Sequence, residues 1–162
     1  MLNNLRARRD REEGFTLIEL MVVVLIIAIL IAIAIPTFLG ARERAQDRAA
    51  QSSLRNALTA AKTAYTDNSD YSKSTGTDLL AIEPSLTYPT TSTGPKEVSV
   101  AVSDVVTVPA PDQQIWAAAV LSKSGKCFWL KDQATGTAAG TKYGSGATCT
   151  GTAALAAAGT SW

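Results

Sequence analysis

The strongest pattern in the chain is an uninterrupted run of apolar residues close to the N-terminus. Between Leu20 and Ile35 there is no polar side chain. With its flanks, from Phe15 to Leu39, the run gives a helix of roughly 37 Å at about 1.5 Å per residue. Because the hydrocarbon core of a bilayer is about 30 Å thick, the sequence predicts a membrane-spanning helix over residues 15–39.

A second helix is predicted directly after this run. From Ala41 to about Tyr65 the chain contains no glycine or proline, and apolar residues recur at steps of three and four. They form a small stripe suited to close packing on a sheet: Ala50, Leu54, Ala57, Leu58, Ala61, Ala64 and Tyr65. The charged residues expected on the polar flanks, in local ion pairs, are Arg42, Glu43, Asp47, Arg48 and Arg55. The pattern predicts an amphipathic helix over about residues 41–66.

Pro36 lies close to the junction of the two predicted helices. Proline has no N–H, and its ring crowds the carbonyl of Ala32, so we expect one long helix with a kink at Pro36. The alternative interpretation places Pro36 at the water-side edge of the membrane, where a loosened backbone costs little.

Alternating apolar residues predict a small antiparallel sheet. A strand with one buried face is indicated by Val98, Val100 and Val102, and is expected to continue after a bulge at Ser103-Asp104 through Val105, Val106 and Val108 until Pro109 and Pro111. Two further strands, Ile115–Leu121 and Lys126–Lys131, flank a turn at residues 122–125 and predict a hairpin.

The remaining segments are predicted to be loops. Residues 66–76 and 88–95 are rich in turn-forming residues. Between them lies a short apolar patch that is expected to cover the sheet: Leu79, Leu80, Ile82 and Leu86. The tail from Gly136 has little secondary-structure propensity. The fold class is therefore α+β, with a long N-terminal helix packed on a sheet over about residues 97–131.

Composition and charge narrow the range of possible functions. The formal net charge is +1, and an Arg-rich head of four arginines precedes Gly14. The chain from Phe15 onward is balanced, so nucleic-acid binding through a broad basic field is not indicated. There is no histidine, which removes the commonest proton shuttle and metal ligand.

The chain has two cysteines, Cys127 and Cys149, in a region rich in Ser, Thr and Gly. An even pair in such a region is typical of a disulfide formed in an oxidising compartment; the alternative is two free buried thiols. Arginines lie on both sides of the apolar run, so the positive-inside rule barely decides the orientation. The cysteines favour a C-terminal part outside the cytoplasm.

The Arg-rich head ends at Gly14, before the apolar run. In a secretory signal the cleavage site follows the apolar region; here, a cut after Gly14 leaves the whole helix on the mature chain and a new amine on Phe15. The run Gly14-Phe15-Thr16-Leu17-Ile18-Glu19-Leu20, the basic leader and Pro36 resemble the N-terminus of type IV prepilins. The resemblance covers residues 1 to about 66, although Ala28 stands where members often carry glycine.

The resemblance implies that residues 1–14 are a leader removed by prepilin peptidase, that Phe15 is N-methylated, and that Glu19 assists assembly. It also implies a homo-polymer, an inner-membrane assembly platform as partner, membrane lipid around the helix before assembly, and a cell-surface pilus afterwards. Physics alone leaves two interpretations of Glu19. It either lies at the headgroups without a role, or pairs with the Phe15 amine of a neighbouring subunit, since opposite charges offset each other's desolvation.

Candidate chemistry is otherwise sparse. Lys123-Ser124-Gly125 resembles a late motif of penicillin-binding enzymes, but the chain lacks a Ser-x-x-Lys nucleophile, which favours a hairpin turn. A calcium site at Asp67, Ser69 and Asp70 lacks ordered ligand spacing. We therefore expect no enzyme, no cofactor and no metal. The leading hypothesis is a type IV pilin; the alternatives are a pseudopilin of a secretion or competence system, a membrane-anchored binding module and an anchored enzyme.

Overall fold

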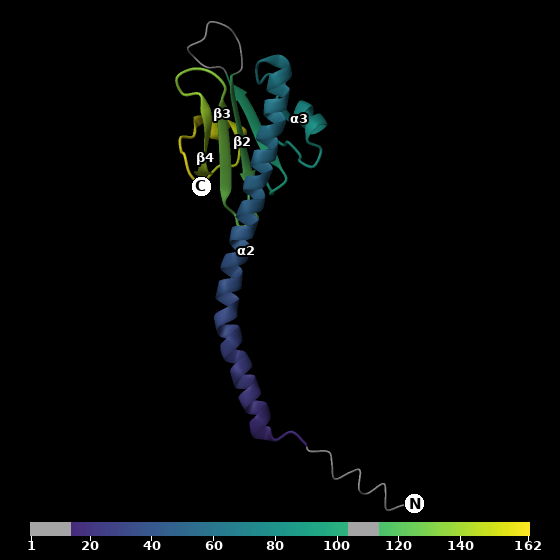
Figure 1. The fold of residues 1–162 in the computed structure, drawn as a ribbon, viewed down its shortest axis with the longest axis vertical. Helices are drawn as coiled ribbons and strands as arrows, with labels where there is room; N and C mark the ends of the chain where they lie inside the picture. The colour runs from purple at the N-terminus through teal and green to yellow at the C-terminus, as the bar shows by residue number, and fades with distance from the viewer. Residues whose placement is uncertain (1–13, 104–113) are drawn as a thin grey trace, which may run out of the picture. The chain divides into compact units, whose positions relative to one another are not determined.

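The computed structural model describes residues 14–103 and 114–162. The chain divides into two compact units, Met1–Ala41 and Arg42–Trp162. Helix α2, Leu17–Asn68, contributes to both (Figure 1). It covers the helix predicted for residues 15–39 except its first two residues, and the whole of the amphipathic helix predicted for about 41–66. The helical conformation of both segments is thus confirmed.

In the first unit, the apolar side chains of α2 face outward. An 18-residue window of α2 has a mean hydropathy of 3.3, and none of it is buried. Large side chains such as Leu17 and Ile18 are 75% and 70% exposed. By length and composition this part of α2 is able to cross a membrane.

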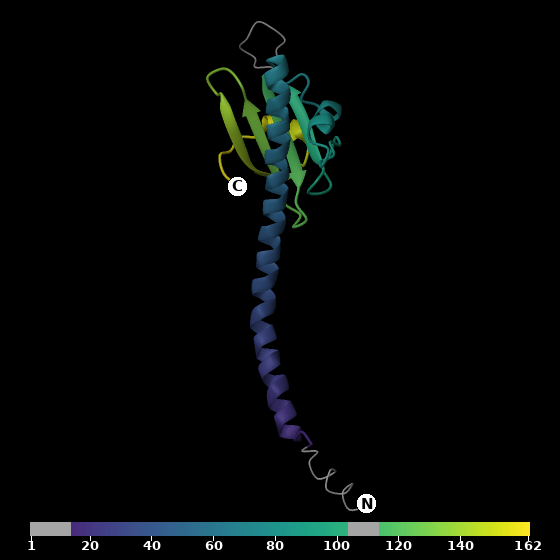
Figure 2. The same ribbon diagram turned by 45° about the vertical axis from the view of Figure 1, so that its right-hand side comes forward.

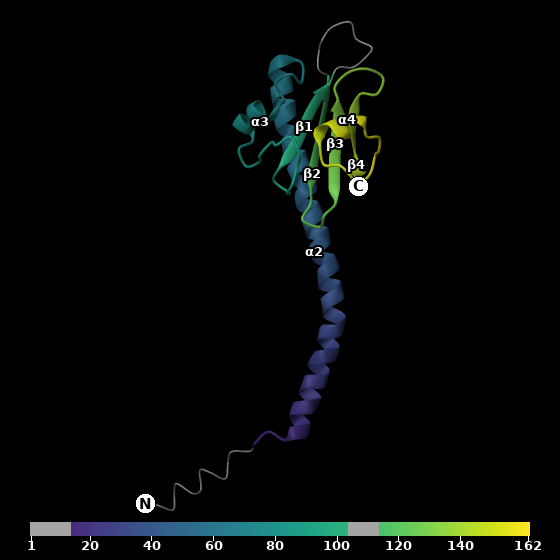
Figure 3. The ribbon, with the colours of Figure 1, turned by 180° about the vertical axis from the view of Figure 1, so that it is seen from behind.

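The second unit contains a four-stranded antiparallel sheet in the order β1-β2-β3-β4 (Figures 1 and 3). Its strands are β1 Val98–Ser103, β2 Ile115–Leu121, β3 Cys127–Gln133 and β4 Gly140–Gly146. In the register, Val98 is opposite Val120, and Cys127 is opposite both Leu121 and Gly146. The predicted hairpin of Ile115–Leu121 with the following strand is confirmed.

Helices cover the two faces of this sheet. The predicted alanine-rich stripe of α2 is buried together with Trp116, Val120 and Leu130. Helix α4, Gly151–Ala156, packs with Ala117, Ala119 and Trp129 on the other face. Because β2 is covered on both faces, it reads as a continuous apolar segment, not as an alternating one.

Two parts of the sequence prediction are wrong. The sheet does not end near Lys131, because β4 extends it to Gly146. The segment 76–82 is not a loop followed by a buried patch but the helix α3, Gly76–Ile82, on which Leu80 and Ile82 are 46% and 41% exposed. Of that patch, Leu79 and Leu86 are buried as expected. The predicted bulge at Asp104 and the strand through Val108 lie outside the described residues.

The glycines of β4 explain why residue propensities do not predict this strand. A Cβ on Gly144 would lie 2.7 Å from Cζ2 of Trp129, and one on Gly146 would lie 3.6 Å from its Cδ1. The indole of Trp129 therefore occupies the space that a side chain at position 144 would need, whereas a Cβ at position 146 would make an ordinary contact with it. Trp129 Nε1 also donates to the Ser145 carbonyl at 3.2 Å. Glycine is depleted in strands, but at position 144 the neighbouring strand requires it.

Candidate processing and assembly site

The predicted cleavage site, Gly14 and Phe15, immediately precedes α2. Both residues are exposed, Phe15 by 79%. A Cβ built on Gly14 would have no atom within 4 Å. Packing in the fold therefore does not require glycine at this position. Cleavage after Gly14 stays a prediction, and it would explain why glycine occupies this position.

Thr16 and Glu19 bind each other at the start of α2. The N–H and Oγ1 of Thr16 donate to Oε2 of Glu19 at 3.2 and 3.0 Å, and the N–H of Glu19 donates to Oγ1 of Thr16 at 3.2 Å. The Thr16 carbonyl accepts from the N–H of Leu20 at 3.2 Å. This is a capping box, in which two side chains satisfy N–H groups that the first turn of a helix leaves unpaired.

The capping box gives Glu19 a role within its own chain that the sequence analysis missed. The spacing Thr-x-x-Glu before an apolar run is the usual sign of this motif, so the sequence could have revealed it. Both donors of Thr16 reach the same oxygen of Glu19, and a carboxylate has about four acceptor positions. Capping therefore leaves room for a third donor, and pairing with the Phe15 amine of a neighbour stays a prediction.

Pro36 lies inside α2. Its missing N–H removes the helical bond to the Ala32 carbonyl. In the same turn, Oγ1 of Thr37 donates to the carbonyls of Ala34 at 2.8 Å and Ile33 at 3.4 Å. A side-chain hydroxyl thus contributes to backbone hydrogen bonding beside the proline. The kink at Pro36 stays a prediction.

Cys127 and Cys149 form a disulfide with their Cα atoms 5.5 Å apart, so the alternative of two free thiols is wrong. The bond joins the first residue of β3 to the segment before α4. The Cys149 carbonyl also accepts from the N–H of Ser92 at 3.0 Å. The tail and the loop at residues 88–95 are therefore both fastened beside the sheet.

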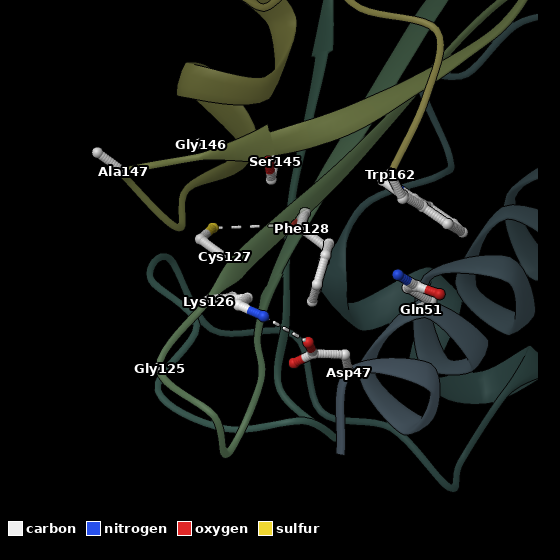
Figure 4. Close-up of a pocket in the computed structure, with 10 residues that line it drawn as sticks. All are labelled: Asp47, Gln51, Gly125, Lys126, Cys127, Phe128, Ser145, Gly146, Ala147 and Trp162. Carbon is white, nitrogen blue, oxygen red and sulfur yellow. Dashed lines mark hydrogen bonds and ion pairs between the residues drawn. The ribbon is translucent and has the colours of Figure 1, made fainter. Parts of the chain in front are cut away.

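Asp47 links the turn between β2 and β3 to α2 through hydrogen bonds and an ion pair. Its carboxylate accepts from Ser122 Oγ at 2.8 Å and from Ser124 Oγ. It also accepts from Lys126 Nζ at 3.1 Å, as Figure 4 shows. Burial alone would raise the pKa of Asp47, but these hydrogen bonds outweigh it and hold the pKa below 3.8. The expected local ion pair on α2 is wrong for Asp47, whereas the predicted turn at Lys123-Ser124-Gly125 is confirmed, with Gly125 at φ +87°.

Asp132 on β3 is the centre of a second polar network. It is 4% exposed and accepts from Tyr71 Oη at 2.6 Å, from Thr141 Oγ1, and from Lys62 Nζ at 3.1 Å. Burial would raise the pKa of Asp132, but the bonds from Thr141, Tyr71 and Lys62 hold it below 3.8. Burial and Asp132 together raise the pKa of Tyr71 above its ordinary range. The network joins α2, the loop after it, β3 and β4.

The calcium candidate is a turn in the structure. Asp70 Oδ1 accepts from the N–H of Ser72 at 2.8 Å, the bond of an Asx turn. Among residues 14–103 and 114–162, no three His, Cys, Asp or Glu side chains gather closely enough to hold a metal ion.

Comparison with known proteins identifies the N-terminal segment. No curated protein and no solved structure shows significant similarity to this chain. The proteins that carry the matching motif are structural, not enzymatic. The chain carries, over residues 9–35, the prokaryotic N-terminal methylation motif, which is the prepilin-type motif of type IV pilins and pseudopilins.

Proposed function

We propose that the chain is the structural subunit of a type IV pilus, cut after Gly14 by prepilin peptidase, methylated on the new amine of Phe15, and polymerised for adhesion, motility or DNA uptake. The observation that supports this most is the methylation motif at residues 9–35, which coincides with an apolar helix whose side chains are exposed. Such a helix leaves the bilayer only if it is buried again, and a bundle of helices at the centre of a polymer buries it.

The remaining parts of the proposal follow from the same segment. Before assembly, residues 15–39 lie in membrane lipid, and an inner-membrane assembly platform receives the processed subunit. The disulfide supports an oxidising compartment for the unit Arg42–Trp162. Glu19 pairs with the Phe15 amine of the next subunit while it caps its own helix.

The motif occurs in pseudopilins as well, so a short secretion or competence filament is the second candidate. The two functions differ in their product. A pilin gives long fibres that shear from the cell surface, whereas a pseudopilin is processed without abundant surface fibres. A monomer that keeps its leader would indicate an anchored binding module instead.

The test combines N-terminal sequencing with recovery of sheared fibres. Native protein is expected to begin at a methylated Phe15, and Gly14→Leu is expected to accumulate as a full-length membrane-bound precursor because the bulky side chain does not fit a cleft shaped for glycine. Asn4→Leu, inside the leader, is the matched control and is expected to be cut normally. Native material that begins at Met1 or Leu2 would refute the proposal.

A further inference from the structure

Helix α3 presents apolar and acidic side chains at the surface of the second unit. Leu80 and Ile82 are the most exposed large apolar side chains that the structure describes from Arg42 onward, at 46% and 41%. Asp78 and Glu83 flank them in sequence, and neither takes part in an ion pair with another described residue. We call Asp78, Leu80, Ile82 and Glu83 the α3 patch. Exposed apolar side chains rimmed by charge are typical of a protein interface.

A groove lies between α2 and the ends of β3 and β4. It holds about 670 Å³, and the residues that line it include Gln51 from α2, Phe128 from β3 and Trp162 (Figure 4). The rings of Phe128 and Trp162 meet edge to face with centroids 6.3 Å apart. The groove therefore has an aromatic wall beside the amide of Gln51.

Two arginines lie on the face of α2 that carries Gln51. Arg48, Gln51 and Arg55 follow one another at steps of three and four, so they share one face of α2. The Arg55 guanidinium lies 5.0 Å from the centre of the Trp162 ring. Within the described part of the chain, neither arginine is in an ion pair, while Lys126 is paired with Asp47. The arginines thus leave an excess of positive charge opposite in sign to the α3 patch.

The α3 patch and the groove lie on opposite sides of the second unit. In Figures 1 and 2, α3 is to the right of α2, whereas β4 and the C-terminus are to its left, and Figure 3 shows the same arrangement from behind. A contact between two different patches of the same chain is heterologous. Heterologous contacts that do not close into a ring propagate as a helical filament.

We propose that the α3 patch of one subunit docks into the groove of a second copy of this chain. Leu80 and Ile82 then pack against Trp162, while Asp78 and Glu83 face Arg48 and Arg55. Complementary charges of this kind fix the register of a contact and disfavour wrong pairings. The inference rests on the proposed filament and names a contact between subunits outside the N-terminal helices.

Disulfide trapping in assembled fibres tests the contact directly, because both native cysteines are already bonded to each other. The full-length chain carries Leu80→Cys in the α3 patch and Gln51→Cys in the groove. Oxidised fibres of the double variant are expected to give a reducible ladder of multimers, whereas each single variant gives no species beyond a dimer. The control replaces Gln51→Cys by Asn56→Cys, an exposed position about 140° further round α2, and is expected to give no ladder.

Charge exchange provides a second measurement. Arg48→Glu and Glu83→Lys are each expected to lower the ratio of sheared fibre to total subunit by roughly tenfold, because each places like charges opposite each other. The two changes together restore the pairing and are expected to recover the fibre. Lys96→Glu, exposed and outside both patches, is expected to leave the ratio unchanged.

The outcomes separate this inference from the filament itself. If the wild-type chain yields no fibres, the proposed pilus subunit fails and this contact fails with it. Fibres that form but give no ladder, or charge exchange that does not recover the fibre, overturn the contact alone and leave the pilus subunit standing.

Discussion

Position 151 is glycine because two backbones meet there. A Cβ on Gly151 would lie 2.3 Å from the carbonyl carbon of Val100 and 2.4 Å from the nitrogen of Ala101. The N–H of Gly151 donates to Ser99 Oγ at 2.9 Å. Neither backbone has a flexible end that could move aside, so the start of α4 is held against β1 without room for a side chain.

Gly151→Ala is therefore expected to destabilise the second unit by about 1–3 kcal/mol, the usual cost of overpacking. Chemical denaturation of the fragment Arg42–Trp162 measures it. Gly94→Ala is the control, because a Cβ there has its nearest contact, with Glu97, at 4.0 Å; a change within about 0.5 kcal/mol is expected. Equal stability of the two variants would contradict the close approach of α4 to β1.

Glu19 caps its own helix and is proposed to pair with the Phe15 amine of a neighbour, and substitution can separate these two roles. Glutamine also completes a capping box, but it carries no charge to pair with an amine. We expect Glu19→Gln and Glu19→Ala both to insert in the membrane, yet both to give less sheared fibre per total subunit than wild type. Thr16→Ala, which removes the cap and keeps the charge, is expected to assemble. If Glu19→Gln assembles like wild type, the charge pairing is wrong and capping alone explains the acid.

At the scale of elements, the sequence predicts those helices and strands that a local pattern of apolar residues determines. The residues 115–121 strand is recovered with its bounds, and the alanine stripe of α2 is buried as its spacing indicates. The element β4 is missed because its glycine-rich sequence has low strand propensity. The element α4 is missed because six residues are too few for its helix-forming alanines to give a periodic pattern. Both elements are ordered by tertiary contacts: Trp129 on β4, and β1 with the disulfide on α4.

The Asp132 network links four elements and makes the stability of the second unit depend on pH. The pKa of Asp132 is lowered from 3.8 in the folded protein, so its stabilisation is present above about pH 4 and is lost as the pH falls through the folded-state pKa. Asp132→Asn is expected to cost about 1–3 kcal/mol at neutral pH, because the buried hydroxyls of the network lose their charged acceptor.

Thermal unfolding between pH 7 and pH 2 measures this dependence. The melting temperature of Asp132→Asn is expected to fall less steeply below about pH 4 than that of wild type. Asp67→Asn, at an exposed position, is the control and is expected to follow the wild-type curve. A parallel fall for wild type and Asp132→Asn would show that other acids govern acid unfolding.

For the whole molecule, the sequence reveals the N-terminal site more readily than the polar networks of the second unit. Gly14, Phe15 and Glu19 belong to one short motif, and even the missed capping box spans four consecutive positions. Asp47 and Lys126 are 79 positions apart, and Tyr71 and Asp132 are 61 apart. Such partners come together only when the chain folds, so local sequence patterns cannot predict their pairing.

The division into two units predicts that they respond separately to reduction. The disulfide lies wholly within Arg42–Trp162 and closes a loop with a sequence separation of 22, which in the chain-entropy account contributes about 3 kcal/mol. Reductant is expected to lower the melting temperature of the fragment Arg42–Trp162, while the reduced full-length chain still floats with membrane vesicles because residues 15–39 are the proposed anchor. The matched variant Cys127→Ser with Cys149→Ser is expected to behave like the reduced chain with or without reductant. Oxidised and reduced fragments that melt together would contradict the role of the bond, and a full-length chain released from vesicles by reductant would contradict the independence of the anchor.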